Sequence, residues 1–401
     1  MALLAYPHPR APPPLLLLLS LLACGPAPSP GPADGGGGTS TPAEVPELRA
    51  ERSLSWTTPA LLEGDGPASF ARVLAAVAPG GNVGPLLRAW FHRFATTAHS
   101  ERALPSQFVD AVAAAQGEDP AAWDLSVLPF SPTGIHNRID LAELRPGGHC
   151  GELRVSHAST DPTLQPFHLL FLFRQPAEPD DLAPDGTVHC AGTARRWAAL
   201  SGLEGPALEA AVRERLAQGL THDRFLLAES VEFTLAPWEW RQWEKVPDPT
   251  GALPFLLDNP PLFQQVDVER VNAPGPLREA FLSFVQANAA ALAGRWQEIP
   301  RAYRAPSIRI NQGVERTPLS LAGLDPAVSA AHPALRQAIE RVGCAACHTA
   351  DADFVHLRPG RGPSPFYVKE LSARVDWLAR AAQGLAPQAP FGPLQKDPVL
   401  P

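Results

Sequence analysis

The sequence predicts an α+β fold, in which a large body of antiparallel sheet and helices is followed by a small all-α segment. Residues 67–116 and 277–296 place apolar side chains at three- and four-residue spacing, which is typical of amphipathic helices. Residues 135–173 contain alternating and unbroken apolar runs between turn residues, which indicates an antiparallel meander. Two further helical patterns, at residues 333–342 and 364–382, follow near the end of the chain.

The chain divides into four predicted parts that differ in composition. The apolar run at residues 15–22 is too short to span a bilayer as a helix, and it fits the core of a secretory signal peptide. No later run of apolar residues reaches the length of a membrane span, so we expect a globular body. The parts are a signal peptide at 1–23, a lipidated flexible linker at 24–48, an α+β body at 49–325 and the C-terminal segment at 326–401.

The signal-like run ends in Leu21-Leu22-Ala23-Cys24-Gly25. This pattern resembles the lipobox of bacterial lipoproteins, in which the cysteine is acylated and becomes the first mature residue. The alternative is an ordinary signal peptide with an incidental cysteine. Residues 25–46 are mostly Pro, Gly, Ala, Ser and Thr, which predicts a flexible spacer. We therefore expect a protein of the bacterial cell envelope, anchored by lipid to the membrane at the periplasmic or the outer surface.

In the body, the first strands carry polar residues in alternation. The pattern predicts strands at residues 135–141, 152–156 and 167–173. Alternation places His136, Arg138 and Asp140 on one face, and Glu152 and Arg154 on one face of the next strand. These side chains could form an acid/base or anion site on rigid strands. A structural ladder of ion pairs is the alternative, and we favour it.

Further along the body we expect two helices, a hairpin, a strand, a long helix and an edge strand. They lie, in this order, at residues 193–200 and 206–220, 230–235 and 238–243, 263–271, 277–296 and 301–311. The hairpin places Trp238 and Trp240 side by side, where they could stack on a sugar ring or a haem edge, or contribute to the core. Pro306 interrupts the last strand, which favours an edge position.

Charge and motifs exclude several functions. The net charge is −8 without a basic cluster, which argues against nucleic acid as a partner. The sequence contains no phosphate loop, no HExxH and no serine in a G-x-S-x-G pattern. It therefore names no enzymatic reaction for the body.

The five cysteines divide into three groups. Cys24 is the lipid acceptor, and Cys344 and Cys347 belong to one short motif. Cys150 and Cys190 remain, and an even remainder in an exported chain indicates a disulfide, with two reduced buried thiols as the alternative.

The short motif is Cys344-Ala345-Ala346-Cys347-His348. This spacing is used for covalent haem attachment, in which each thiol forms a thioether to the porphyrin and the histidine is the proximal iron ligand. The alternatives are a redox-active dithiol, a zinc site with His332 or His356, and a plain disulfide. Haem attachment takes place outside the cytoplasmic membrane, where the lipobox also predicts this chain to be, so two independent patterns agree.

The order of helix, motif, loop and helix over residues 330–385 resembles the mononuclear cytochrome c family. The resemblance implies a cytochrome c-like segment with one haem c and terminal helices that cross beside it. The sequence departs from the family in its short loop and in its methionine content, because Met1 is the only methionine and leaves with the signal peptide. His356 is therefore the candidate distal ligand, with a surface loop histidine as the alternative. Arg358 and Arg361 could pair with haem propionates.

The layout as a whole resembles a group of uncharacterised exported bacterial lipoproteins. The similarity lies in the strands Asn137-Arg138-Ile139-Asp140-Leu141 and Cys150-Gly151-Glu152-Leu153-Arg154 before a terminal Cys-x-x-Cys-His, and in Phe354-Val355-His356 after it. We expect an envelope lipoprotein that binds one haem c and transfers electrons to or from an unknown redox partner protein. The alternatives are a non-redox binding or structural lipoprotein, whose cysteine pair is a disulfide or a metal clip, and a haem oxidoreductase with an open sixth position.

Overall fold

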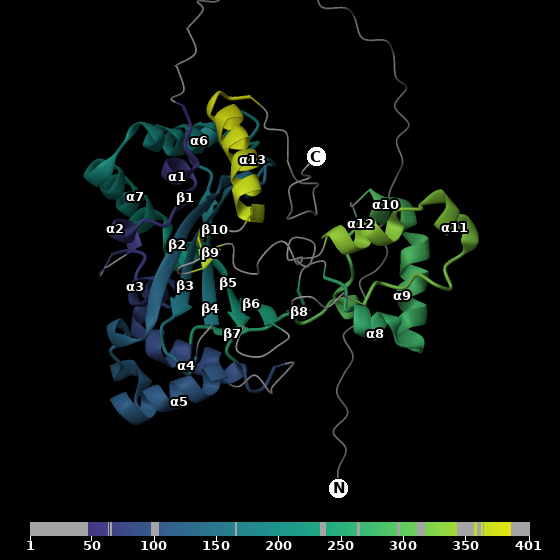
Figure 1. Ribbon diagram of the computed structural model, residues 1–401, viewed down its shortest axis with the longest axis horizontal. Coiled ribbons are helices and arrows are strands. Elements are labelled where there is room, and N and C mark those ends of the chain that lie inside the picture. Colours follow the sequence, from purple (N-terminus) through teal and green to yellow (C-terminus); the bar gives the residue numbers. More distant parts are fainter. Residues whose placement is uncertain are drawn as a thin grey trace, which may run out of the picture. The chain divides into compact units, whose positions relative to one another are not determined.

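An antiparallel sheet forms the body of the protein (Figure 1). The computed structural model describes residues 47–62, 64, 66–97, 104–164, 167–232, 238–262, 265–294, 297–310, 317–342, 357–358, 362–363 and 365–385. Strands β1 to β7 lie side by side in chain order, and β8 pairs with the beginning of β6. The strands are β1 Ser55–Trp56, β2 Phe130–Arg138, β3 His149–Ser159, β4 Phe167–Pro176, β5 Phe225–Glu232, β6 Trp238–Val246, β7 Leu256–Asp258 and β8 Ile308–Ile310. The antiparallel meander and the α+β class that the sequence predicts are therefore confirmed.

The pairing register gives the sheet two different faces. His136 lies opposite Arg154, and Arg138 lies opposite Glu152, so these polar residues share one face of β2 and β3. Apolar residues of β2, β3 and β4 point to the other face, as alternation requires. Among them are Ile135, Leu153, Val155, Phe171 and Phe173, which are all buried.

Three helices cover the apolar face: α3 Phe70–Val77, α4 Val83–Arg93 and α5 Leu104–Gln116. Their aromatic side chains contact those of the sheet. Trp90 lies 6.0 Å from both Phe171 and Trp243, measured between ring centroids. Such aromatic pairs each contribute about 0.5–1.5 kcal/mol beyond the area that they bury.

Close packing at α4 depends on a glycine. A Cβ at Gly84 would lie 1.9 Å from the carbonyl oxygen of Pro120, which no side chain can do without a shift of the backbone. Glycine at position 84 therefore lets the first turn of α4 approach Pro120 more closely than any other residue at that position would allow.

Four further helices and a polar chain contribute to this core. The helices are α1 Ala50–Ser53, α2 Pro59–Leu62, α6 Ala191–Ala198 and α7 Gly205–Gly219. Trp197 of α6 donates a hydrogen bond to Gln175 Oε1 at 2.8 Å, and Gln175 Nε2 donates to Asn137 Oδ1 at 2.8 Å. These buried polar groups are satisfied in a chain that ties α6 to β4 and β2.

A second hydrophobic cluster contains helices that follow β7 in sequence. They are α8 Val268–Asn272, α9 Pro276–Ala287, α10 Ala289–Ala293, α11 Pro326–Ala331 and α12 Leu335–Val342. Phe281 and Val285 of α9 pack in this cluster with Leu335 and Ile339 of α12. The last helix, α13 Pro365–Ala382 (yellow in Figure 1), instead buries Leu378 in the core of the sheet. The two helices that flank the cysteine motif in sequence therefore belong to different hydrophobic clusters.

Three sequence predictions for the region after the hairpin need correction. Residues 268–272 form helix α8 and not a strand, because the Asp267 carboxylate accepts the Arg270 N–H and begins a helix. The predicted helix at 277–296 is divided at Asn288, whose side-chain amide donates to the Phe284 carbonyl at 2.8 Å. The predicted edge strand at 301–311 is confirmed only as the short strand β8, which pairs with β6.

Candidate functional site

The cysteine motif and its ligands lie outside the described residues. This holds for the predicted lipid acceptor Cys24, for Cys344, Cys347 and His348, and for the candidate distal ligand His356. Their roles stay predictions. The described chain ends before the motif at the last residue of α12 and begins again with β9 Leu357–Arg358, which pairs with β10 Gly362–Pro363 and contacts β2.

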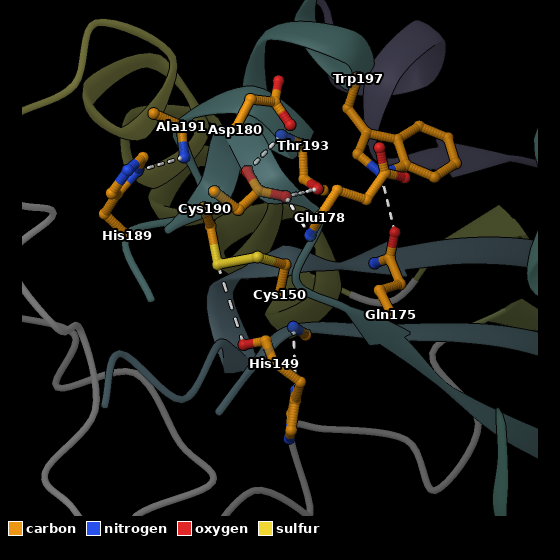
Figure 2. Close-up of a disulfide and its surroundings, with 12 residues drawn as sticks. His149, Cys150, Gln175, Glu178, Asp180, His189, Cys190, Ala191, Thr193 and Trp197 are labelled. Atoms are coloured by element: carbon orange, nitrogen blue, oxygen red, sulfur yellow. Dashed lines mark hydrogen bonds between the residues drawn. A yellow bond between two sulfur atoms is a disulfide. The ribbon is translucent and has the colours of Figure 1, made fainter. Parts of the chain in front are cut away.

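Cys150 and Cys190 form a disulfide with a Cα–Cα distance of 5.4 Å (Figure 2). Both cysteines are fully buried. The bond joins β3 to the residue before α6, and Cys190 has a φ of 56°, in the left-handed region that non-glycine residues rarely adopt. The pair left over in the sequence is thus joined in the structure.

An aspartate holds the first turn of α6 beside this disulfide. The Asp181 carboxylate accepts hydrogen bonds from the Thr193 N–H and the Thr193 hydroxyl, each at 2.6 Å. Arg196 of the same helix forms an ion pair with Asp181 at 3.2 Å. Cys190 is the N-cap residue of α6, and its side chain makes no capping hydrogen bond. Asp181 accepts the hydrogen bond from an N–H group in the first turn of α6 in its place.

The polar residues of β2 meet α13 in a buried cluster of four charges. Arg138 contacts Asp140 at 2.9 Å and Glu370 at 3.2 Å, and Arg374 contacts Glu370 at 2.6 Å and Asp140 at 3.7 Å. At most 8% of any of these four side chains is exposed. We name this set the four-charge cluster. It is electrically neutral, so the desolvation of each charge is offset by opposite charges.

Arg138 keeps its positive charge within the four-charge cluster. Burial opposes the charge on Arg138, but Asp140 and Glu370 outweigh this effect and raise the pKa of Arg138 above its ordinary value. Asp140 itself lies in a 3-10 turn, Ile139–Leu141, and not in the predicted strand. The turn brings its carboxylate back to the Arg138 guanidinium. On the charged face that the sequence predicts, Arg138 and Asp140 therefore form ion pairs with residues of helix α13.

A second polar group lies beside the four-charge cluster. The Tyr367 hydroxyl of α13 lies 2.8 Å from His136 Nδ1 and donates a hydrogen bond to the Ser55 hydroxyl. Ser55 Oγ also lies 3.1 Å from the same ring nitrogen. Burial raises the pKa of Tyr367 above its ordinary value.

This arrangement differs from a hydrolase site. In a Ser-His-Asp triad the serine and the carboxylate bind opposite nitrogens of the imidazole, whereas here two hydroxyls meet one nitrogen. Ser55 is also buried, with 6% of its surface exposed, so no substrate reaches it in this conformation. Among the described residues no group of three or more His, Cys, Asp and Glu side chains could hold a metal ion.

Sequence reasoning missed the contribution of α13 to this site. Tyr367, Glu370 and Arg374 recur at three- and four-residue spacing, which places a polar stripe beside the apolar stripe of the same helix. That stripe was the available signal. The apolar pattern of residues 364–382 also predicts Val368 as an inner position, and this prediction is wrong, because Val368 is 53% exposed.

The tryptophans of β6 are divided between the two faces of the sheet. Trp243 lies in the aromatic core, 4.3 Å from Phe94 between ring centroids. Trp240 is also buried, on the other face. Arg241 places its guanidinium 5.2 Å from the Phe94 ring and pairs with Glu239 at 3.1 Å. The core contribution considered from the sequence concerned Trp238 and Trp240. Of these, Trp240 is buried, whereas the tryptophan of β6 in the aromatic core is Trp243.

No helix among the described residues is long and apolar enough to cross a membrane. The chain matches no protein-family model, no curated protein and no solved structure.

Proposed function

We propose that this protein is a lipoprotein of the bacterial cell envelope that binds one covalent haem c and transfers electrons. The observation that carries the proposal is the motif Cys344-Ala345-Ala346-Cys347-His348. Cys344 and Cys347 would form the thioethers, and His348 would be the proximal iron ligand. His356 is the proposed distal ligand.

The compartment supports this proposal. A lipid on Cys24 would anchor the chain outside the cytoplasm, where haem is attached to such motifs. The Cys150–Cys190 disulfide fits an oxidising compartment. With these two cysteines joined and Cys24 at the predicted lipid site, Cys344 and Cys347 are the pair left in the sequence for haem.

Bound haem c would supply a one-electron iron couple. Ligation by two histidines usually gives a lower reduction potential than ligation by histidine and methionine, because the thioether raises the potential. The proposed partner is a redox protein of the envelope.

The test is production of the chain together with the cytochrome c maturation system. We expect a pyridine haemochrome spectrum of one covalent haem, which is lost in the Cys344→Ser, Cys347→Ser variant. The matched control is Cys150→Ala, Cys190→Ala, which removes the other cysteine pair and should keep the haem. Absence of covalent haem in the unchanged chain would overturn the proposal and leave the non-redox lipoprotein.

A second variant tests the distal ligand. His356→Ala should convert a low-spin spectrum to a high-spin one, because the iron loses a strong axial ligand. An unchanged low-spin spectrum would remove His356 from the site. A high-spin spectrum in the unchanged chain would instead favour a haem oxidoreductase with an open sixth position.

A further inference from the structure

One buried tyrosine of this protein lies within hydrogen-bond distance of a histidine that can accept its proton. Tyr367 is one of only three tyrosines in the sequence, and 4% of its surface is exposed. Its hydroxyl lies 2.8 Å from His136 Nδ1, within hydrogen-bond distance. His136 and Ser55, which complete the group, are 8% and 6% exposed.

The acceptor role of His136 depends on its tautomer. The hydroxyls of Tyr367 and Ser55 both lie within hydrogen-bond distance of Nδ1. The Tyr367 hydroxyl donates to Ser55, whose own proton can be donated to Nδ1, or it can turn its proton directly toward Nδ1. We assign the ring proton to Nε2, which leaves Nδ1 as the acceptor. The phenolic proton can therefore pass to His136 directly, or through the Ser55 hydroxyl, 3.1 Å from the same nitrogen.

This geometry meets the chemical requirement for one-electron oxidation of a phenol. A phenol that loses an electron becomes a strong acid and must lose its proton at the same time. Water supplies the acceptor for an exposed tyrosine, whereas a buried tyrosine depends on a base within hydrogen-bond distance. Imidazole is the side chain best suited to accept that proton near neutral pH.

We propose that Tyr367 and His136 form a redox-active pair that donates one electron to a one-electron oxidant of high potential. In the step, Tyr367 loses one electron and its O–H bond breaks, which leaves a neutral phenoxyl radical. The proton forms an N–H bond at His136 Nδ1 and gives an imidazolium. The oxidant gains the electron, and return of an electron and of the proton restores the phenol.

The charges around the pair allow this step. The imidazolium would face Arg154, which is its neighbour across β2 and β3, and Arg138 on its own strand. The Arg374 guanidinium lies 5.7 Å from the Tyr367 ring. Each of these three cations pairs with a carboxylate, supplied by Glu152, Asp140 and Glu370. The set carries no net charge, so the new positive charge meets no net repulsion.

The inference goes beyond the proposed haem function, because any one-electron acceptor of sufficient potential can serve as the oxidant. Its test therefore uses an external oxidant. The full-length protein is mixed with a ruthenium tris-bipyridine complex and a sacrificial electron acceptor, illuminated and frozen. The radical is then identified by electron paramagnetic resonance.

We expect a tyrosyl radical in the unchanged protein, loss of its signal in Tyr367→Phe, and no loss in the matched control Tyr303→Phe. His136→Gln keeps a polar side chain but removes the base, and should slow radical formation by roughly 10²-fold, as for other positioned proton acceptors. A tyrosyl signal that persists in Tyr367→Phe, or an unchanged rate in His136→Gln, would overturn the proposal.

A second measurement guards against misfolding of the variants. Replacement of tyrosine by fluorotyrosine throughout the chain keeps every hydroxyl and adds a fluorine hyperfine coupling to a tyrosyl radical. The coupling must appear in the labelled protein and must persist in labelled Tyr303→Phe. Its absence from either would show that the radical does not form on Tyr367.

Discussion

His157 should make the free energy of unfolding depend on pH. The side chain is fully buried between Phe70 and Phe171, whose ring centroids lie 5.4 and 5.7 Å from the imidazole. One ring nitrogen, Nε2, donates to the Ala68 carbonyl at 2.9 Å. The other, Nδ1, has no hydrogen-bond partner in the described structure. Burial lowers the pKa of His157 from 6.5 to about 4, so the folded protein holds a neutral ring.

The sign and size of the effect follow from proton linkage. Between pH 4 and 6.5 the unfolded chain binds a proton at this position and the folded chain does not, so stability falls as the pH falls. The two pKa values differ by an amount that corresponds to about 3.4 kcal/mol, at about 1.36 kcal/mol per pKa unit. About 2 kcal/mol of this is lost between pH 7 and pH 5.

The assay is urea unfolding at pH 7 and at pH 5, for the unchanged protein and for His157→Gln. Glutamine can still donate to the Ala68 carbonyl, but it does not titrate, so the variant should lose about 2 kcal/mol less over this interval. His332→Gln is the control, because that histidine is only half-buried. An equal loss of stability in the unchanged protein and in His157→Gln would refute the reasoning.

Three further variants, one of them with its own control, test the packing by urea unfolding. Arg138→Met should lower the free energy of unfolding by about 3–5 kcal/mol, because the two buried carboxylates that it contacts lose a cation; a change below 1 kcal/mol, on the order of an exposed pair, would contradict a buried role. Cys150→Ala with Cys190→Ala should cost about 4 kcal/mol, the chain entropy of a loop of 40 residues, and equal stability would exclude this account. Gly84→Ala should cost about 1–3 kcal/mol through overpacking. Gly202→Ala, which has open space around it, should change stability little, and equal losses would refute the contact.

The elements that the sequence predicted well are those whose local pattern and tertiary environment agree. Strands β2 to β4 have one buried face and turn residues between them, and their alternation gave the correct pairing. The stretch from Val266 to Glu269 also alternates, but a single side chain, Asp267, caps a helix there. The short alternation alone could not distinguish a strand from a helix.

Only those residues of the candidate site that lie on strand β2 and in the turn after it could be predicted from the sequence. Arg138 and His136 were identified from alternation, and their shared face is confirmed. Their partners Tyr367 and Glu370 lie more than 200 residues away in sequence, and the pairing depends on where α13 packs. Long-range pairing between a strand and a distant helix leaves no periodic signal that joins the two segments.

The placement of α13 bears on the prediction for the C-terminal segment. The cytochrome c-like arrangement that the sequence predicts there would have its two terminal helices cross beside one haem. Here α12 buries Leu335 and Ile339 with α9, whereas α13 buries Trp377 and Leu378 with the sheet. The four-charge cluster also restricts how α13 can pack. Glu370 and Arg374 must lie beside Arg138 and Asp140, because each buried charge needs an opposite charge to offset its desolvation. Removed from the sheet, α13 would expose both its apolar side chains and two charges that need Arg138 and Asp140. This argues that the C-terminal helix folds as part of the body.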